Sequence, residues 1–119
     1  MTGCGLMSQT TTKRLSNIDV ELTAKFFRGL GDASRLKILE HLLENESDIE
    51  ELAELLKVPI QQVNRHLSCL AWCGYIIARE IDKRVYYMIA DKRIEQLIKM
   101  AEGLMTNRAY FINTCKVIK

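Results

Sequence analysis

The sequence has little of what enzymes and membrane proteins usually need. Among its 119 residues are two histidines and one proline, with no glycine-rich phosphate loop and no nucleophile beside a base and an orienting group. No apolar run approaches the roughly 18 residues of a membrane span, and the first residues lack the apolar core of a secretion signal. We therefore expect a single-domain, non-enzymatic, cytoplasmic protein without membrane attachment.

The charge is small overall but unevenly distributed. The net charge is +2, yet residues 32–56 carry eight acidic and two basic groups, whereas residues 57–93 carry seven basic and three acidic groups. A polyanion such as DNA would therefore meet the segment 57–93 rather than the acidic segment before it.

Apolar residues at helical spacing predict helices over about residues 17–30, 33–44, 49–56, 59–72 and 92–105. Predicted boundary residues are the N-caps Asp32, Asp91 and either Ser47 or Asp48, Pro59 near the first position of the fourth helix, and Gly74 at its end. After that glycine, the runs "YIIARE" and "VYYMIA" predict a β-hairpin with Lys83 and Arg84 at its tip.

This order of elements indicates a mainly α protein with a β-hairpin wing, a winged helix-turn-helix. The predicted sequence is four helices, the hairpin and one last helix. We assign the DNA-binding domain to residues 16–106, between a mobile N-terminal segment, 1–15, and a C-terminal tail, 107–119.

The fourth predicted helix has one apolar and one polar face. With Leu67 at 0° and about 100° per residue, Val63 and Leu70 fall on the core side, while Gln61, Arg65 and Gln62 fall between about 120° and 220°. Glutamine can pair with adenine and arginine with guanine in the major groove. Together with the preceding turn and the basic hairpin, this polar face predicts DNA binding.

Two cysteines follow on the same helix, Cys69 at about 200° and Cys73 at about 240°. These angles predict that both thiols face outward rather than into the core. Residues four apart on a helix lie about 5–6 Å from each other, which suits a shared soft metal ion better than a disulfide. Spacing alone leaves core packing, redox chemistry and metal binding open.

The chain resembles the ArsR/SmtB family of metal-responsive repressors over about residues 20–105. The resemblance rests on "LGDASRLKILEHLLE", "VNRHLSCLAWCGYI" and the wing "REIDKRVYYMIAD". Within that family, "HLSCL" followed by "CG" resembles the cadmium- and lead-sensing branch represented by CmtR. The cysteine and histidine patterns of the arsenic and zinc sites on other helices of the family are absent.

The resemblance implies a homodimer that represses transcription by binding a palindromic operator and releases it when a soft metal ion binds. Cadmium(II) or lead(II) is favoured, with zinc(II), mercury(II) or arsenic(III) as further candidates. The implied ligands are Cys69, Cys73 and, from the tail of the other subunit, Cys115. The predicted DNA contacts are Gln61, Gln62, Asn64, Arg65, Lys83 and Arg84.

The sequence also fits other functions. The same fold could sense oxidants or reactive sulfur through its thiols, or bind a protein partner through the polar helix face. Cys4 is a further metal ligand or a bystander. We interpret His41 and His66 as structural, and Trp72 as a packing residue.

Overall fold

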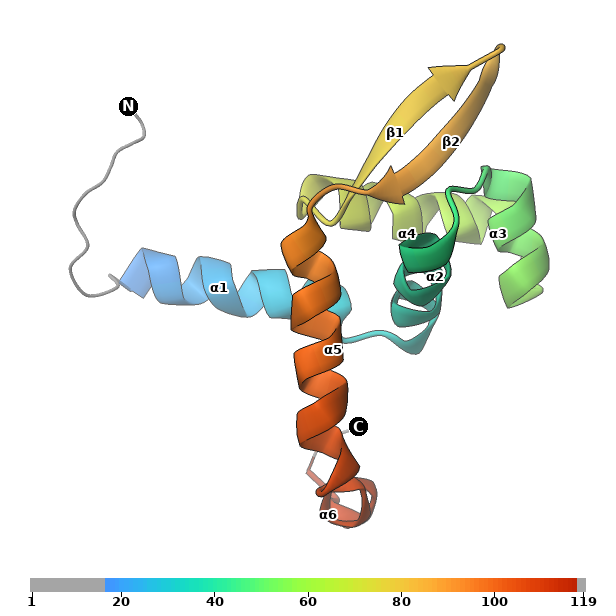
Figure 1. Ribbon diagram of the computed structural model, residues 1–119. Helices are drawn as coiled ribbons and strands as arrows, with labels where there is room; N and C mark the ends of the chain where they lie inside the picture. The colour runs from blue at the N-terminus through green and yellow to red at the C-terminus, as the bar shows by residue number, and fades with distance from the viewer. Residues whose placement is uncertain (1–16, 118–119) are drawn as a thin grey trace.

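The computed structural model describes residues 17–117 and places them in six helices and one hairpin (Figure 1). The predicted mainly α fold with a wing is confirmed, and the predicted mobile segment and Cys4 lie outside the described residues. The elements are α1 (Asn17–Leu30), α2 (Ala33–Glu44), α3 (Ile49–Leu56), α4 (Ile60–Trp72), β1 (Ile76–Ile81), β2 (Arg84–Ile89), α5 (Lys92–Thr106) and α6 (Ala109–Thr114).

The core forms where α2, α3, α4 and α5 meet the start of β1. Its buried apolar side chains are those of Ile38, Leu39, Leu42, Leu52, Val63, Leu67, Leu70, Tyr75, Ile76, Ile94 and Ile98. The three buried residues of α4 are the ones that the helical wheel places on its core side. The opposite side of α4 therefore remains available to solvent and ligands.

Side-chain and backbone caps set the helix boundaries. Asp32 accepts hydrogen bonds from the backbone at the start of α2, Asp91 does the same for α5, and Asp48 forms a capping box with Glu51 at α3. At the end of α4, Gly74 has φ +86°, and the two 5→2 and 6→1 backbone bonds of a Schellman motif close the helix. These local signals explain why most predicted boundaries agree with the structure.

The turn between α3 and α4 is tight. Lys57 ends α3 in the left-handed region at φ 58°. Pro59 is the N-cap of α4, one position earlier in the helix than the predicted first helical position. The short turn makes α3 and α4 the two helices of a helix-turn-helix, with α4 as the second.

The hairpin is a two-stranded antiparallel ribbon in which Ile76 pairs with Ile89 and Ile81 pairs with Arg84. Asp82 and Lys83 form its two-residue turn, and both have positive φ, as a type I′ turn requires. Backbone bonds in both directions between Ser47 and Tyr87 attach β2 to the segment before α3.

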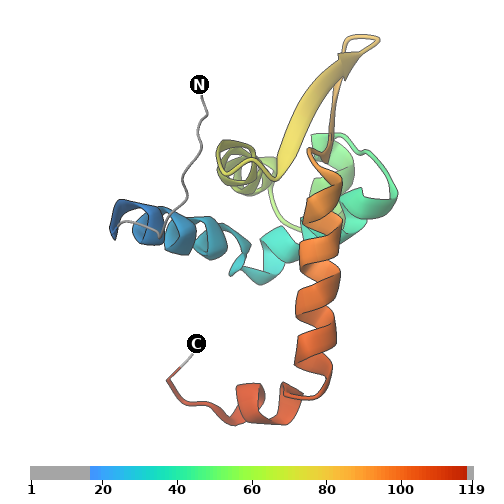
Figure 2. The ribbon, with the colours of Figure 1, turned by 60° about the vertical axis from the view of Figure 1, so that its left-hand side comes forward.

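The helices α1 and α5 extend away from this core, and the short α6 lies at the far end of α5 (Figures 1 and 2). The predicted order lacks α6, because the tail sequence shows no extended helical period. No helix within the described range is long and apolar enough to span a bilayer.

Candidate thiol site and nucleic-acid interface

The polar face of α4 is exposed to solvent. Gln61, Gln62, Asn64 and Arg65 are all exposed on the first two turns of the helix, as the wheel predicts for the two glutamines and the arginine. Amide groups can donate to and accept from the edges of DNA bases, and guanidinium groups can donate to them. The structure thus brings these four predicted residues together on one face.

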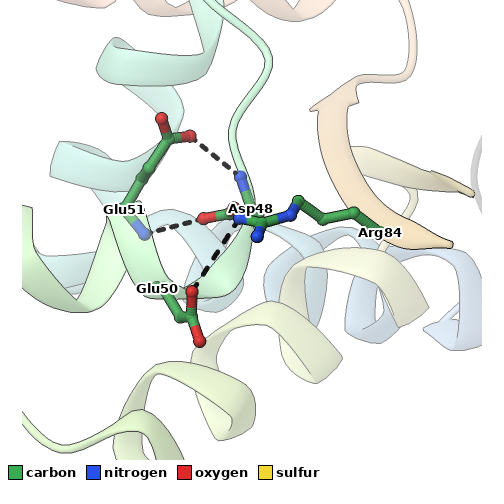
Figure 3. A network of polar contacts seen from close by, with 4 residues as sticks. All are labelled: Asp48, Glu50, Glu51 and Arg84. Atoms are coloured by element: carbon green, nitrogen blue, oxygen red, sulfur yellow. Dashed lines mark hydrogen bonds and ion pairs between the residues drawn. The ribbon is translucent and has the colours of Figure 1, made fainter. Parts of the chain in front are cut away.

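The wing presents Lys83 and Arg84 differently. Lys83 lies in the turn and is exposed, whereas Arg84 begins β2 and its Nη1 donates to Asp48 Oδ2 at 2.6 Å. The same carboxylate accepts from the backbone N–H of Glu51 at 2.8 Å, and Glu50 lies 3.9 Å from Arg84 (Figure 3). Sequence analysis predicts Arg84 as a DNA contact, but its guanidinium has a partner within the protein.

Cys69 and Cys73 are one helical turn apart, as predicted, and the Cys73 thiol lies within hydrogen-bond reach of Cys69. Cys73 is the C-cap of α4. Burial raises the pKa of the Cys73 thiol, and the neighbouring Cys69 thiol raises it further. The pair therefore offers two soft donors in one place.

The prediction that both thiols face outward is wrong for Cys73. Its side chain packs against the edge of the hydrophobic core, and a Cβ atom built on Gly29 would lie 3.1 Å from its Sγ. The cause is tertiary: the end of α1 covers this part of α4. Arg35 holds that end in place, because its Nε donates to the carbonyl oxygen of Gly29 at 2.7 Å.

Tyr75 belongs to the same contact and was missed by the sequence analysis. It is fully buried, stacks on Phe26 with ring centroids 4.6 Å apart, and donates its hydroxyl hydrogen to the Phe26 carbonyl oxygen at 2.8 Å. Tyrosine after a helix-ending glycine gives no sequence signal for this role. It ties α1 to the end of α4 beside the thiols.

The packing role predicted for Trp72 is also wrong, because 91% of its side chain is exposed. A signal was present: on the same wheel Trp72 falls at about 140°, on the outward face. His41 is structural as predicted, since its Nε2 hydrogen-bonds to Ser47 Oγ at 2.8 Å. His66 is half-buried on α4, and its structural role stays a prediction.

Cys115, the C-cap of α6, lies at the far end of α5 from α4 (Figures 1 and 2). Over residues 17–117, no three histidine, cysteine or acidic side chains gather closely enough to hold a metal ion. The two thiols of α4 fit a soft cation by donor type, but residues 17–117 do not bring a third protein ligand to them, so that it has to come from a second subunit or from the part of the chain outside that range.

The chain is similar to known bacterial regulatory proteins. The family described as bacterial regulatory protein, arsR family, matches residues 32–78. A probable mercury resistance operon repressor from Streptomyces lividans is 37% identical over 95 residues, which cover 80% of this chain and 76% of the relative.

Two solved structures agree with the fold. The homodimeric winged helix-turn-helix domain Mb0332 from Mycobacterium bovis superposes with a TM-score of 0.70 at 23% identity, covering 76% of this chain and 83% of that one. The cadmium sensor CmtR from Mycobacterium tuberculosis gives a TM-score of 0.55 at 34% identity, covering 62% of this chain and 76% of the sensor.

Proposed function

Since this chain belongs to the arsR family of bacterial regulatory proteins, we propose that it is a metal-responsive repressor that acts as a homodimer in the cytoplasm. The observation that carries the proposal is the placement of Cys69 and Cys73 on α4, the helix that also carries the exposed polar residues proposed as DNA contacts. A ligand held by these thiols acts on the DNA-binding element itself.

The DNA contacts in this proposal come from α4 and the wing. In the homodimer, two copies of α4 enter successive major grooves of a palindromic operator, with Gln61, Gln62, Asn64 and Arg65 facing bases or nearby phosphates. Lys83 at the wing tip contacts the sugar–phosphate backbone or the minor groove.

Exposed apolar residues on α1 and α5 support the homodimer. The exposed side chains are those of Val20, Leu22 and Phe27 on α1 and Met100, Leu104 and Met105 on α5. A groove of about 330 Å³ with mostly apolar walls lies between α1, α2 and α5. Exposed apolar side chains that gather along two helices are typical of a protein interface.

The proposed metal ligands are Cys69, Cys73 and Cys115 of the second subunit. Three thiolates suit cadmium(II), lead(II) or mercury(II), and a soft cation supplies a cross-link between them once the thiols are deprotonated. Cys73 contacts Gly29 of α1, so that its position couples α4 to the helices of the proposed dimer interface. A coupling free energy of about 1–3 kcal/mol would weaken DNA binding roughly 5–150-fold.

The raised pKa of the Cys73 thiol argues against the redox alternative. Oxidant-sensing cysteines are typically exposed and have lowered pKa values, whereas Cys73 is partly buried and its pKa is raised. Mass spectrometry after mild oxidant tests this directly: a disulfide that forms in proportion to loss of DNA binding would favour the redox function.

Metal-driven DNA release tests the proposal. A labelled duplex, selected by the protein from a random-sequence library, is titrated with the full chain and then with cadmium(II), lead(II) or mercury(II), following fluorescence anisotropy. We expect release by the wild type, and little or none by Cys69→Ser and Cys73→Ser. Ser68→Ala, an exposed change on the same helix, is the matched control and should respond like the wild type. Release that persists in both cysteine variants would place the effector site elsewhere.

A further inference from the structure

The wing is joined to the first helix of the helix-turn-helix through one carboxylate (Figure 3). Asp48 Oδ1 caps α3, while Oδ2 takes the short ion pair with Arg84. The Asp48 side chain is only 8% exposed, whereas that of Arg84 is 57% exposed. These two residues are 36 positions apart, so that the pair links the wing to a distant part of the chain.

Two sets of contacts attach the wing to the segment at the start of α3. One is the ion pair, and the other is the pair of backbone bonds between Ser47 and Tyr87, at 3.1 and 2.7 Å. Arg84 directly follows the two-residue turn that carries Lys83. The place of Lys83 relative to the polar face of α4 therefore depends on where the guanidinium of Arg84 is held.

We propose that Arg84 is a positioning residue, which fixes the wing on the N-cap of α3 and does not itself contact DNA. Charge-assisted hydrogen bonds of this length are short and directional, which suits orientation. An arginine this exposed contributes little to stability, because solvent screens the ion pair. The inference rests on the DNA binding in the proposed function, but not on its metal response.

The decisive substitution is Asp48→Asn, because asparagine is as good an N-cap as aspartate and only the charged partner of Arg84 is lost. Glu50→Gln is the matched control, since it removes the same charge 3.9 Å from Arg84 without breaking the short pair. Both variants raise the net charge equally. If Arg84 contacted phosphate, freeing it in Asp48→Asn would leave DNA binding unchanged or tighter.

Affinity for a labelled mixed-sequence DNA duplex is measured by anisotropy against salt concentration, using the full metal-free protein. We expect Asp48→Asn to bind roughly three- to tenfold more weakly than Glu50→Gln, the scale of losing a phosphate contact at each wing. Equal or tighter binding by Asp48→Asn overturns the proposal. Circular dichroism confirms that each variant is folded at the temperature used.

The salt dependence gives a second test that does not rely on Asp48→Asn alone. The slope of log K against log salt is negative, and Lys83→Gln should reduce its magnitude by about 0.9 per wing, as expected for a lost phosphate contact. Arg84→Gln should weaken binding, and adding it to Asp48→Asn should change neither slope nor affinity further. An additional slope change in the double variant identifies Arg84 as a phosphate contact. If the wild type shows no salt-dependent DNA binding at all, the proposed function fails instead.

Discussion

Cys73 at the end of α4 lies directly against Gly29 of α1: a Cβ atom at Gly29 would meet the Cys73 Sγ at 3.1 Å and a Tyr75 ring carbon at 3.4 Å. Glycine is therefore the residue that lets α1 approach the thiol pair closely. The contact connects the candidate metal site to a helix of the proposed dimer interface.

Gly29→Ala should stabilise the fold less than a glycine-to-alanine substitution at a helical position with free space. Alanine in a helix is worth about 1 kcal/mol over glycine, but the tight contact offsets this gain by a similar amount. Gly103→Ala is the control, because a Cβ at this position in α5 meets nothing within 4 Å. Urea denaturation should therefore show stabilisation by Gly103→Ala of about 0.5–1 kcal/mol and a clearly smaller effect of Gly29→Ala. Equal stabilisation would show that the contact is not tight.

Tyr75→Phe should destabilise the fold by about 1–2 kcal/mol, because it leaves the partly buried Phe26 carbonyl without the tyrosine hydroxyl at 2.8 Å. Burial raises the pKa of this phenol, in keeping with a neutral donor. Tyr110→Phe removes the same group from a side chain that is 72% exposed and should change the free energy of unfolding little. The two urea denaturation curves decide the matter, and coincident midpoints would contradict the role of the hydroxyl group.

Stability should fall in acid through Asp48. The backbone N–H of Glu51 and the guanidinium of Arg84 hold the pKa of this carboxyl below its usual value of 3.8. A carboxylate with a lowered folded pKa stabilises the fold above its unfolded pKa, and this stabilisation is lost as pH falls through the folded pKa. The difference in unfolding free energy between wild type and Asp48→Asn should be constant near neutral pH and shrink below about pH 4. A difference that is independent of pH would contradict the lowered pKa.

Local signals predicted much of the fold, and long-range contacts account for what was missed. Asp32, Asp91 and Gly74 act on their own helix ends, so sequence alone places them. The burial of Cys73 and the pairing of Arg84 depend on α1 and α3, which approach only in the folded chain. Patterns along one helix or strand carry no information about its neighbours, and therefore predict neither contact.

Substitution of Cys115 should affect the response to cadmium(II) and lead(II) more than the response to mercury(II). Cadmium(II) and lead(II) prefer three or more thiolates, whereas mercury(II) is commonly satisfied by two, and among residues 17–117 the structure brings Cys69 and Cys73 together without a third ligand. Cys115→Ser should therefore abolish DNA release by cadmium(II) and lead(II) but preserve much of the release by mercury(II). The ultraviolet thiolate-to-metal charge-transfer band should fall in parallel for cadmium(II). Cys4→Ser, the remaining cysteine, is the matched control and should respond like the wild type to each metal. Unchanged cadmium release in Cys115→Ser would exclude the tail cysteine as a ligand, and loss of cadmium release in Cys4→Ser would make Cys4 the third ligand instead.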